Sequence, residues 1–284
     1  MLELILSQVA NGLVLGFLYV LIALGLSIIF GMLGIVNFAH GAIFALGAYF
    51  AVTLVPIFGW WGLLLVPVII AALGVLLEVT IIQRLYGKEP LLGLIVTFGL
   101  ALLIEALIKY FWGPGGWPFS PPDFLRGFIE VGPVLLTKYR LAVIVSTLVI
   151  LFALWLLMVR TPFGRIIRAG SEDREMLGML GVNVPRVFVG VVALSFCLAG
   201  IAGMLAAPLW TVTPSMAASA IMPAFVIVTI GGLGSYLGAI VAGLMVGIVT
   251  ALTIQFWPAA AGASMYVLMA AILLVRPRGL FGER

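Results

Sequence analysis

The polar side chains that could act on a solute are few in this chain, and they interrupt long apolar runs. The stretch GMLGIVNFAHG, residues 31–41, places Asn37 and the only histidine, His40, between two such runs. Glu105 and Lys109 stand four residues apart within a later run. Amide and imidazole groups can hydrogen-bond a passing solute, or they can brace the helix that faces it.

Catalytic and metal-binding motifs are missing from the sequence. It contains no GxxxxGK[ST] loop, so the chain cannot hydrolyse ATP by that route. Neither HExxH nor GxSxG occurs, one histidine cannot form a histidine-rich metal site, and the lone Cys197 excludes an internal disulfide. No span carries the paired carboxylates that an intramembrane enzyme would need. We therefore expect neither an enzyme nor a metal site.

The elements that must position these polar groups are helices that cross a membrane. Of the 284 residues, 64% are apolar and 8% are charged, whereas a soluble domain carries about 25% charged residues. A spanning helix needs roughly 20 consecutive apolar residues. We predict a single all-α polytopic bundle over residues 1–284 with about nine spans (8–10), near 5–30, 39–57, 62–83, 91–112, 140–159, 186–209, 218–233, 237–256 and 263–275.

Basic residues fall unequally on the two sides of such a bundle. With nine spans, one side receives Arg84, Lys88, Arg160, Arg165, Arg168, Arg174, Arg186, Arg276, Arg278 and Arg284. The other side receives only Lys109, Arg126, Lys138 and Arg140. The positive-inside rule puts the larger set in the cytoplasm. We therefore predict that the N-terminus lies outside and the C-terminus inside.

The break at residues 31–41 has two interpretations. If the first span ends near Gly34, Asn37 can cap the next helix and His40 lies in its first turn, which satisfies exposed backbone donors. Alternatively, the break lines a path through the membrane, and Asn37, His40 and Gly41 lie beside the substrate. Both interpretations stay open at this point.

A second interruption, PLWTVTPSMAASAIMP at residues 208–223, follows a span in the other half of the chain. Paired interruptions in corresponding positions are typical of transporters whose substrate path is built from broken helices. The prolines Pro208, Pro214 and Pro223 leave open whether 210–235 forms one span or a re-entrant pair.

Apart from Arg140 and Arg186 at the start of their spans, three charged groups lie inside the predicted spans. Glu105 and Lys109 have the favourable order for an (i, i+4) pair, so we interpret them first as a structural ion pair and only second as a substrate contact. Glu78 lies six residues before Arg84, near the end of its span. We expect its carboxylate to reach water there and to be structural.

Residues 160–186 form the most polar stretch and are predicted to lie inside. Ser171 is the expected N-cap of a short helix that ends near Gly181, with Glu172, Asp173 and Glu175 in its first turn. An apolar stripe runs beside these charges, made of Met176, Leu177, Met179 and Leu180. Because the acidic residues are poorly suited to an anionic membrane, we favour a protein-docking helix over one that rests on lipid headgroups.

The other long connection, residues 110–139, is rich in proline, glycine and aromatic residues and is predicted to lie outside the membrane. Tyr110, Trp112, Trp117 and Phe119 are typical of a membrane-interface belt. Its charged residues are Asp123, Arg126 and Glu130, which either contact an external partner or face lipid headgroups.

Several stretches resemble the permease subunits of branched-chain amino-acid ABC importers. The resemblance begins in NGLVLGFLYVLIALGLSIIFGMLGIVNFAHGAIFALGAYF and continues through IIQRLYGKEPLLGLIVTFGLALLIE and FGRIIRAGSEDREMLGMLGVNVPRV. It extends through GGLGSYLGAIVAGLMVGI to the terminal LVRPRGLFG, so it includes essentially the whole chain in order. The most specific motifs are NFAHG and RAGSEDREMLGMLG, which here has the spacing RAxxEDxxxxGxxG.

The resemblance implies a multi-pass subunit of a bacterial or archaeal cytoplasmic membrane, in which alternating access moves branched-chain amino acids. The implied partners are a homologous second permease subunit, two cytoplasmic ATP-binding subunits that hydrolyse ATP, and an extracytoplasmic solute-binding protein. No nucleic acid and no cofactor of its own are implied. The short inside helix would be the coupling helix, with the motif residues Arg168, Ala169, Glu172, Asp173, Gly178 and Gly181 docking the ATPase.

One departure from the family pattern concerns the substrate. Relatives often carry an acidic residue directly after NFAHG, and this chain has Ala42. The same architecture carrying urea, short amides or other amino acids is therefore an alternative, and a channel is an alternative from another class. A channel has no need of an ATPase-docking helix, which favours the importer.

Overall fold

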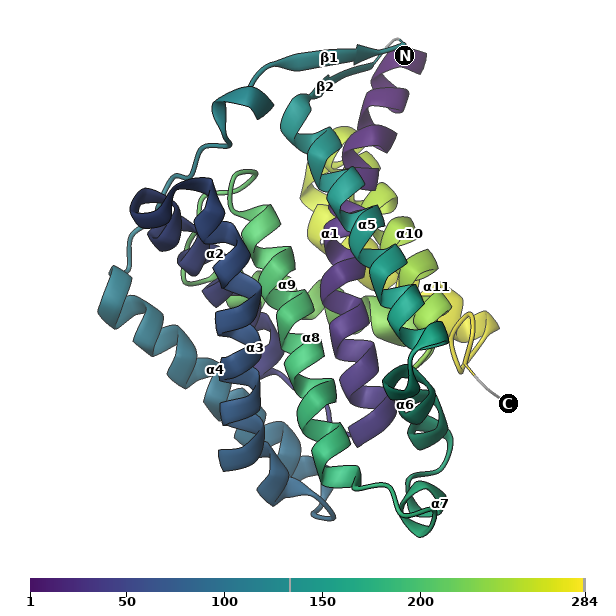
Figure 1. Ribbon diagram of the computed structural model, residues 1–284. Helices are drawn as coiled ribbons and strands as arrows, with labels where there is room; N and C mark the ends of the chain where they lie inside the picture. The colour runs from purple at the N-terminus through teal and green to yellow at the C-terminus, as the bar shows by residue number, and fades with distance from the viewer. Residues whose placement is uncertain (133, 283–284) are drawn as a thin grey trace.

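The predicted apolar spans all appear as helices. The computed structural model describes residues 1–132 and 134–282 (Figure 1). Within these ranges the apolar helices are α1 (Leu2–Leu33), α2 (Ala39–Phe58), α3 (Leu65–Thr80), α4 (Pro90–Trp112), α5 (Lys138–Arg160), α8 (Val184–Ala206), α9 (Met216–Gly231), α10 (Tyr236–Phe256) and α11 (Ala261–Val275). Short 3-10 turns lie in the connections between them: η1 (Gly59–Leu64), η2 (Ile82–Leu85), η3 (Asp123–Leu125) and η4 (Pro258–Ala260).

By length and composition, seven helical segments in the described part of the chain can cross a membrane. The nine predicted runs reduce to seven for two reasons. First, α2 and α3 count as one segment, Ala39–Leu85, although the chain turns at Gly59 with a φ of +61°. Second, α9 has only 16 residues, about 24 Å at 1.5 Å per residue, which is shorter than an ~30 Å hydrocarbon core.

Helix α1 lies at the centre of the bundle and packs against α8, α9 and α10 (Figure 1). Its middle is buried from Val20 to Leu24 on every side, so no face of α1 is left for lipid there. α8 is the second central helix, because α2 and α3 pack on it from the other side. The core is therefore made by two long helices that are distant in sequence.

Glycines let the backbones of α1 and α10 approach closely. A Cβ atom added at Gly12 would lie 2.7 Å from the Cα atom of Ile248, a distance that real Cβ atoms essentially never show. Gly16, one turn further along α1, has Leu244 Cα at 3.0 Å from the same hypothetical position. Van der Waals packing of this kind drives helix association in lipid, where no hydrophobic driving force acts between helices.

Helices α4, α5 and α11 lie at the periphery and expose most of their apolar side chains. Phe98 and Leu102 on α4, Val149 and Phe152 on α5, and Val267 on α11 are each at least half exposed. Such surfaces are stable against lipid acyl chains or against another apolar protein surface.

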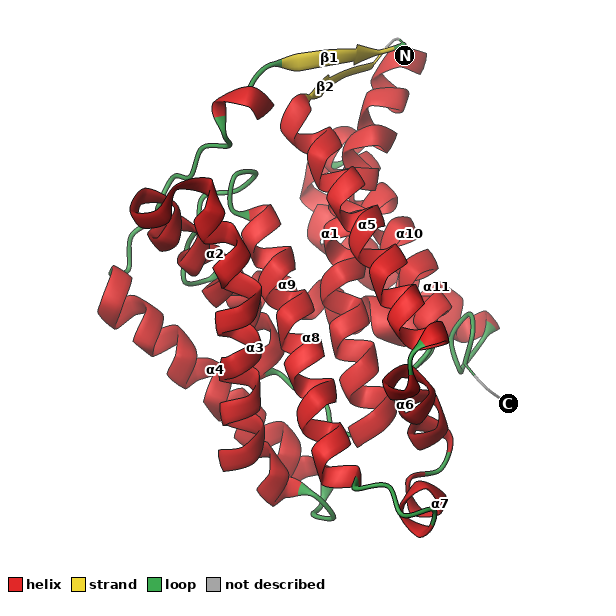
Figure 2. Cartoon of the chain, viewed as in Figure 1, coloured by secondary structure: helices red, strands yellow, loops and turns green. Residues whose placement is uncertain are grey.

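Two short helices, α6 (Pro162–Glu172) and α7 (Arg174–Met179), project from one end of the bundle (Figure 2). The predicted N-cap Ser171 is wrong, since its hydroxyl donates to the Arg168 carbonyl at 2.7 Å inside α6. Asp173 is the cap instead, because its carboxylate accepts the N–H groups of both Glu175 and Met176 at 2.9 Å. The helix expected after Ser171 therefore begins at Arg174.

The opposite end carries a β-hairpin that the helical prediction did not include. Strands β1 (Phe128–Val131) and β2 (Val134–Thr137) pair antiparallel with Phe128 opposite Thr137. An isolated bridge also joins Trp117 to Val212, with N–H···O distances of 2.8 and 3.0 Å. The described residues of the connection 110–139 thus lie over this end and are tied to the segment between α8 and α9.

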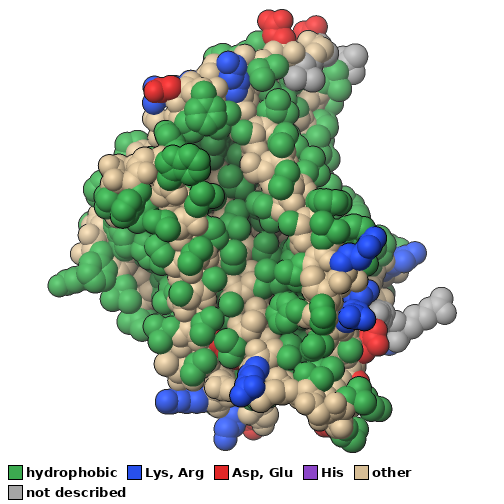
Figure 3. Space-filling view, in the orientation of Figure 1, with side chains coloured by type: hydrophobic (Ala, Val, Ile, Leu, Met, Phe, Trp, Pro, Cys, Tyr) green, Lys and Arg blue, Asp and Glu red, His purple; other side chains and the backbone are tan. Residues whose placement is uncertain are grey.

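Charge is divided between the two ends. In the face shown, lysine and arginine side chains gather mainly toward the end of the molecule that carries α6 and α7, while the middle of the molecule is a broad apolar band (Figure 3). Some basic and acidic side chains also lie at the hairpin end (Figure 3). This division agrees with the unequal charge count of the sequence and identifies the apolar band as the membrane-embedded zone.

Candidate functional site

The break between α1 and α2 begins at a glycine that ends α1. Gly34 has a φ of +65°, and its N–H donates to the Phe30 carbonyl at 2.8 Å, so the chain leaves the helix in the left-handed conformation that favours glycine. The guanidinium of Arg174, from α7, donates to the Leu33 carbonyl at 2.9 Å. A cation at the C-terminus of a helix is favourable because the last carbonyls carry partial negative charge.

His40 shows how far the chain returns toward the middle of the bundle. Its Nε2 atom lies 3.0 Å from the Ile22 carbonyl oxygen, which only accepts, so Nε2 carries the proton. Ile22 stands eleven residues before Leu33 in α1, roughly 16 Å at 1.5 Å per residue. That is about half of an ~30 Å hydrocarbon core, so α2 starts near mid-depth.

The imidazole of His40 is enclosed between α1 and α8. The ring is fully buried, and a Cβ atom at Gly25 would lie 2.8 Å from its Cε1 atom. The Phe196 ring lies against it with centroids 6.0 Å apart. Among the described residues no hydrogen-bond partner meets His40 Nδ1, so the imidazole fastens α2 to α1 through one nitrogen only.

Asn37 and Thr97 hold the segment that leads into α2. Asn37 Oδ1 accepts the Ala39 N–H at 3.0 Å, which satisfies one of the free donors at the start of the helix. The amide nitrogen of Asn37 is buried without a partner in the described part of the chain. Thr97 of α4 places its hydroxyl 3.1 Å from the Val36 carbonyl and 3.3 Å from the Phe38 N–H.

Gly41 lies where α2 meets the start of α9. A Cβ atom there would meet the Ala217 carbonyl oxygen first and would lie 2.7 Å from Ile221 Cβ, so the two helices touch backbone to backbone. The rings of Phe38 and Phe225 stack beside this contact with centroids 6.3 Å apart. The structure therefore brings the two sequence interruptions together, and the open alternative for 210–235 resolves to one short helix, α9, preceded by an irregular segment.

Hydroxyl groups lie exposed at the start of α9. Ser215 and Ser219 are exposed, and Thr213 Oγ1 lies 3.0 Å from Ser215 Oγ. The next residues on the same helix, such as Ala220 and Ala224, are buried. One face of the start of α9 thus exposes two serines, whose hydroxyls bond within this chain, beside Ala218 and Met222, and its other face packs into the core.

The ion pair of α4 is confirmed, and it stands apart from the break. Lys109 Nζ lies 2.7 Å from Glu105 Oε1, with side chains 50% and 24% exposed. Glu105 is eight residues beyond Thr97, about 12 Å further along α4, so the structure does not bring the pair to Asn37, His40 and Gly41.

The expectation that Glu78 reaches water is wrong. Its side chain is fully buried, and neither carboxylate oxygen has a hydrogen-bond partner among the described residues. The reason is the packing of α3 on α8: one turn earlier, a Cβ atom at Gly74 would lie 3.1 Å from the Phe196 ring. The sequence placed Glu78 near a helix end, but did not show which face of α3 is covered.

The residues of the predicted docking segment lie on α6, α7 and the following turn. Ala169 accepts the Asp173 N–H at 2.9 Å, and Gly181 makes the turn after α7 with a φ of +81°. Arg168, Glu172, Asp173 and Gly178 are exposed. On α7, Leu177 is buried, whereas Met176 is 50% exposed and Met179 is 75% exposed. Leu180, directly after the helix, is 73% exposed. The segment thus presents an apolar, partly acidic knob to the exterior.

The sequence comparison assigns this architecture to a class of transport proteins. Residues 8–276 match the family described as "Branched-chain amino acid transport system / permease component". The chain therefore belongs to this family of membrane permeases, which are not enzymes. Permeases of ABC systems bind no cofactor, and partner subunits hydrolyse the ATP.

Two of the relatives, BraD and LivH, match over nearly their full length. The chain is 27% identical over 294 residues to BraD, a high-affinity branched-chain amino acid permease protein of Pseudomonas aeruginosa, with 98% of this chain and 96% of BraD covered. It is 28% identical to LivH of Escherichia coli K12, with the same two shares covered. LivM of Escherichia coli K12 is 27% identical, with 93% of this chain and 67% of LivM covered.

Sequence reasoning missed three residues of the site: Gly25, Thr97 and Arg174. Each acts through a contact with a residue far away in the chain, and each looks ordinary in its own segment. For Arg174, the one available signal was its position beside the motif acids Glu172 and Asp173.

Proposed function

We propose that this permease forms the translocation path of an ATP-driven importer of branched-chain amino acids. The observation that carries the proposal is the start of α2 near mid-depth, against the start of the short helix α9. Broken helices that meet at the bilayer midplane form the substrate site in many transporters, because their free N–H groups and unwound backbone can bind a polar solute. Asn37, His40 and Gly41 then brace the broken helix, and the exposed hydroxyls of α9 border the path.

The orientation follows from the charge division. The end with α6 and α7 faces the cytoplasm, because it carries the larger set of basic residues. The hairpin end then faces outward, where the connection 110–139 meets a solute-binding protein. Glu105 and Lys109 serve as a structural ion pair in this scheme.

Segment 160–186 couples the path to ATP hydrolysis. The exposed knob of Met176, Met179 and Leu180 docks into an ATPase groove, and the capping acid Asp173 fixes the direction of α7. Arg174 joins this helix to the last turn of α1, directly before the break. Movement of the ATPases thereby reaches the broken helix, which rocks between inward-open and outward-open arrangements.

A second permease subunit completes the path. The start of α9 exposes Ser215 and Ser219, which bond to Thr213 and to the Met216 carbonyl within this chain and keep further acceptor capacity that lipid cannot satisfy. A homologous chain that covers this face supplies the other wall. In this proposal the partner is a homologous permease subunit, and the resemblance of this chain to both LivH and LivM supports that choice.

The experiment that tests the proposal is leucine uptake by proteoliposomes that contain this chain with its co-purifying permease, ATPase and binding-protein partners. An importer accumulates leucine against its gradient only with ATP, and valine and isoleucine compete while urea does not. A channel equilibrates leucine without ATP and never concentrates it. ATP-dependent uptake of urea or another solute without leucine would retain the transporter and overturn the substrate.

A further inference from the structure

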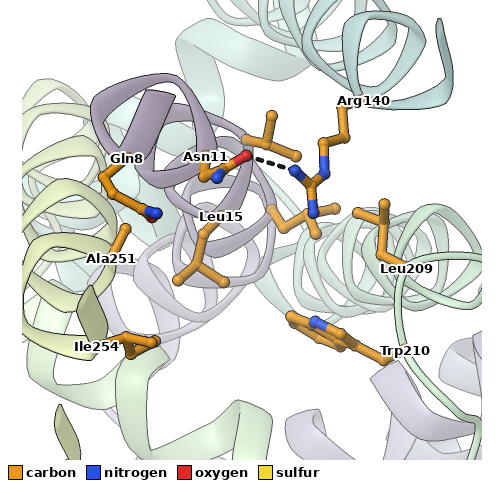
Figure 4. Close-up of a pocket in the computed structure, with 10 residues that line it drawn as sticks. Gln8, Asn11, Leu15, Arg140, Leu209, Trp210, Ala251 and Ile254 are labelled. Atoms are coloured by element: carbon orange, nitrogen blue, oxygen red, sulfur yellow. Dashed lines mark hydrogen bonds between the residues drawn. The ribbon is translucent and has the colours of Figure 1, made fainter. Parts of the chain in front are cut away.

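A polar cavity lies at the hairpin end of α1, away from the break. It has a volume of about 190 Å³ and is walled by α1, α5, α10 and the segment after α8 (Figure 4). Gln8, Asn11 and Arg140 supply polar groups, and Leu15, Leu18 and Ile254 supply apolar ones. Figure 4 shows the Arg140 guanidinium pointing toward Asn11, with Trp210 across the cavity from both.

The guanidinium of Arg140 has unmatched charge in this cavity. Its Nη1 atom donates to Asn11 Oδ1, which is a neutral acceptor. Among the described residues, the ion pairs are Lys109–Glu105 and Arg126–Asp123, so no carboxylate neutralises Arg140. A guanidinium has five N–H donors in a fixed fork, which matches the two oxygens of a carboxylate.

The position of Arg140 in α5 adds to this preference for an anion. The residue lies in the first turn of α5, where Thr137 accepts the Arg140 backbone N–H at 3.3 Å and the remaining free N–H groups carry partial positive charge. The Arg140 guanidinium and the partial positive charge at the start of α5 therefore both attract an anion.

The other walls of the cavity offer groups that suit the ammonium group and the aliphatic side chain of an amino acid. Gln8 donates from Nε2 to Gln255 Oε1 at 2.9 Å, which leaves the Gln8 carbonyl oxygen free to accept from an ammonium group. Val14, Leu15 and Ile254 offer an aliphatic surface on the same cavity. A small cavity with one cation, amide acceptors and branched apolar walls suits one small zwitterion better than a lipid tail.

We infer that this cavity is an outer subsite that binds an aliphatic α-amino acid, with the carboxylate on Arg140 and the ammonium group on the Gln8 amide. The inference rests on the proposed function and deepens it, because it names groups of this chain that would select the substrate. The subsite lies toward the proposed outer side and receives the amino acid before the path at the break does.

The test measures leucine binding to the purified permease–ATPase complex without binding protein, by saturation-transfer NMR, which detects weak ligands. For Arg140→Gln we expect the leucine Kd to rise about tenfold or more, because a charge-assisted hydrogen-bonded pair is lost. Leucinamide, which lacks the carboxylate, should bind the unmodified complex weakly and be unaffected by the substitution. Arg126→Gln, at the same end but paired with Asp123, is the matched control and should leave the leucine Kd unchanged.

A second variant guards against misfolding. Leu15→Phe fills the cavity without altering the charge and should also raise the leucine Kd. Unchanged leucine binding in both Arg140→Gln and Leu15→Phe would overturn the subsite. A second result would also overturn it: Arg140→Gln leaves the leucine Kd unchanged but removes a dependence of the complex on anionic lipid, so that Arg140 binds a lipid headgroup instead. The uptake experiment on the unmodified complex tests the proposed substrate, and the binding experiment on the variants tests the subsite. Failure of leucine uptake would therefore refute the substrate and would not be mistaken for failure of this site.

Discussion

His40 fits between α1 and α8 only because residue 25 has no side chain. A Cβ atom at Gly25 would lie 2.7 Å from the Ser195 carbonyl oxygen and 2.8 Å from the imidazole. Gly25→Ala therefore forces α1 and α8 apart or expels the ring, and overpacking of this kind costs about 1–3 kcal/mol. We expect a lower thermal midpoint for the purified complex and at least about a tenfold loss of leucine uptake.

Gly99→Ala is the matched control for that substitution. Gly99 also lies in a helix of the apolar band, but nothing lies within 4 Å of a Cβ atom there. Alanine has a better helix propensity by up to about 1 kcal/mol, so stability should hold or rise. Equal effects of the two substitutions would show that the seat of His40 does not matter.

At the scale of residues, the break itself could be predicted, since its glycines and the polar residues Asn37 and His40 lie within one short stretch. That these residues border a substrate path stays a prediction. The residues that contact Asn37 and His40 could not be predicted. Gly25 and Thr97 belong to spans whose apolar patterns are uniform, and nothing in the sequence shows which turn of those spans faces the break. Glu78 was placed wrongly for the same reason.

At the scale of elements, Arg174 connects helix α7 to the break after α1. Its guanidinium donates to the Leu33 carbonyl and so links α7 directly to the end of α1. We expect Arg174→Gln to leave membrane insertion and ATP hydrolysis intact while lowering the leucine transported per ATP several-fold. Arg165→Gln, an exposed arginine of α6, is the control. An unchanged transport-to-hydrolysis ratio in Arg174→Gln would remove Arg174 from the coupling route.

The acidic edge of the docking segment provides a second test at this scale. Replacing Glu172 and Asp173 with lysines reverses two exposed charges and removes the cap of α7, which alone costs about 1 kcal/mol. We expect loss of ATPase assembly or of coupling, with normal membrane insertion. The same reversal at Asp123 and Glu130 on the hairpin end should spare assembly. Normal uptake by the Glu172 and Asp173 variant would contradict the coupling role.

Among the elements, the long apolar runs were predictable because hydrocarbon demands about 20 apolar residues for each full span. The start of α7 was predicted two residues too early, since Ser171 and Asp173 are both cap formers and the sequence does not show which one leaves α6. The hairpin of β1 and β2 was not predicted, because its short strands lie in a connection whose proline, glycine and aromatic content indicated only a loop at the membrane interface.

The orientation of the whole molecule is testable with single cysteines in a Cys197→Ala background. Met179 on α7 is 75% exposed and Phe128 on the hairpin is 65% exposed, so cysteine at either position meets water. A membrane-impermeant thiol reagent added to intact cells that express the chain without its ATPase partners should label Phe128→Cys and spare Met179→Cys until the membrane is opened. The reverse pattern would contradict the orientation derived from the basic residues.

The two sequence interruptions are distant in the chain, and their meeting beside Gly41 is a property of the whole molecule. α1 carries the chain to one end, residues 34–38 return it to mid-depth, and α9 begins on the other side of Gly41. The exposed hydroxyls at the start of α9 then face either a path or lipid, and the two environments differ in access to water.

The measurement that separates those environments is the accessibility of Ser219→Cys, in a Cys197→Ala background, in the reconstituted complex. Ala224→Cys, on the buried face of the same helix, is the control and should stay unlabelled. For a path with alternating access, a charged thiol reagent labels position 219 from one side without nucleotide and from the other side when the ATPases are trapped closed. Position 219 remaining closed to the charged reagent in both states, while a lipid-soluble reagent labels it, would contradict the placement of the path at the break.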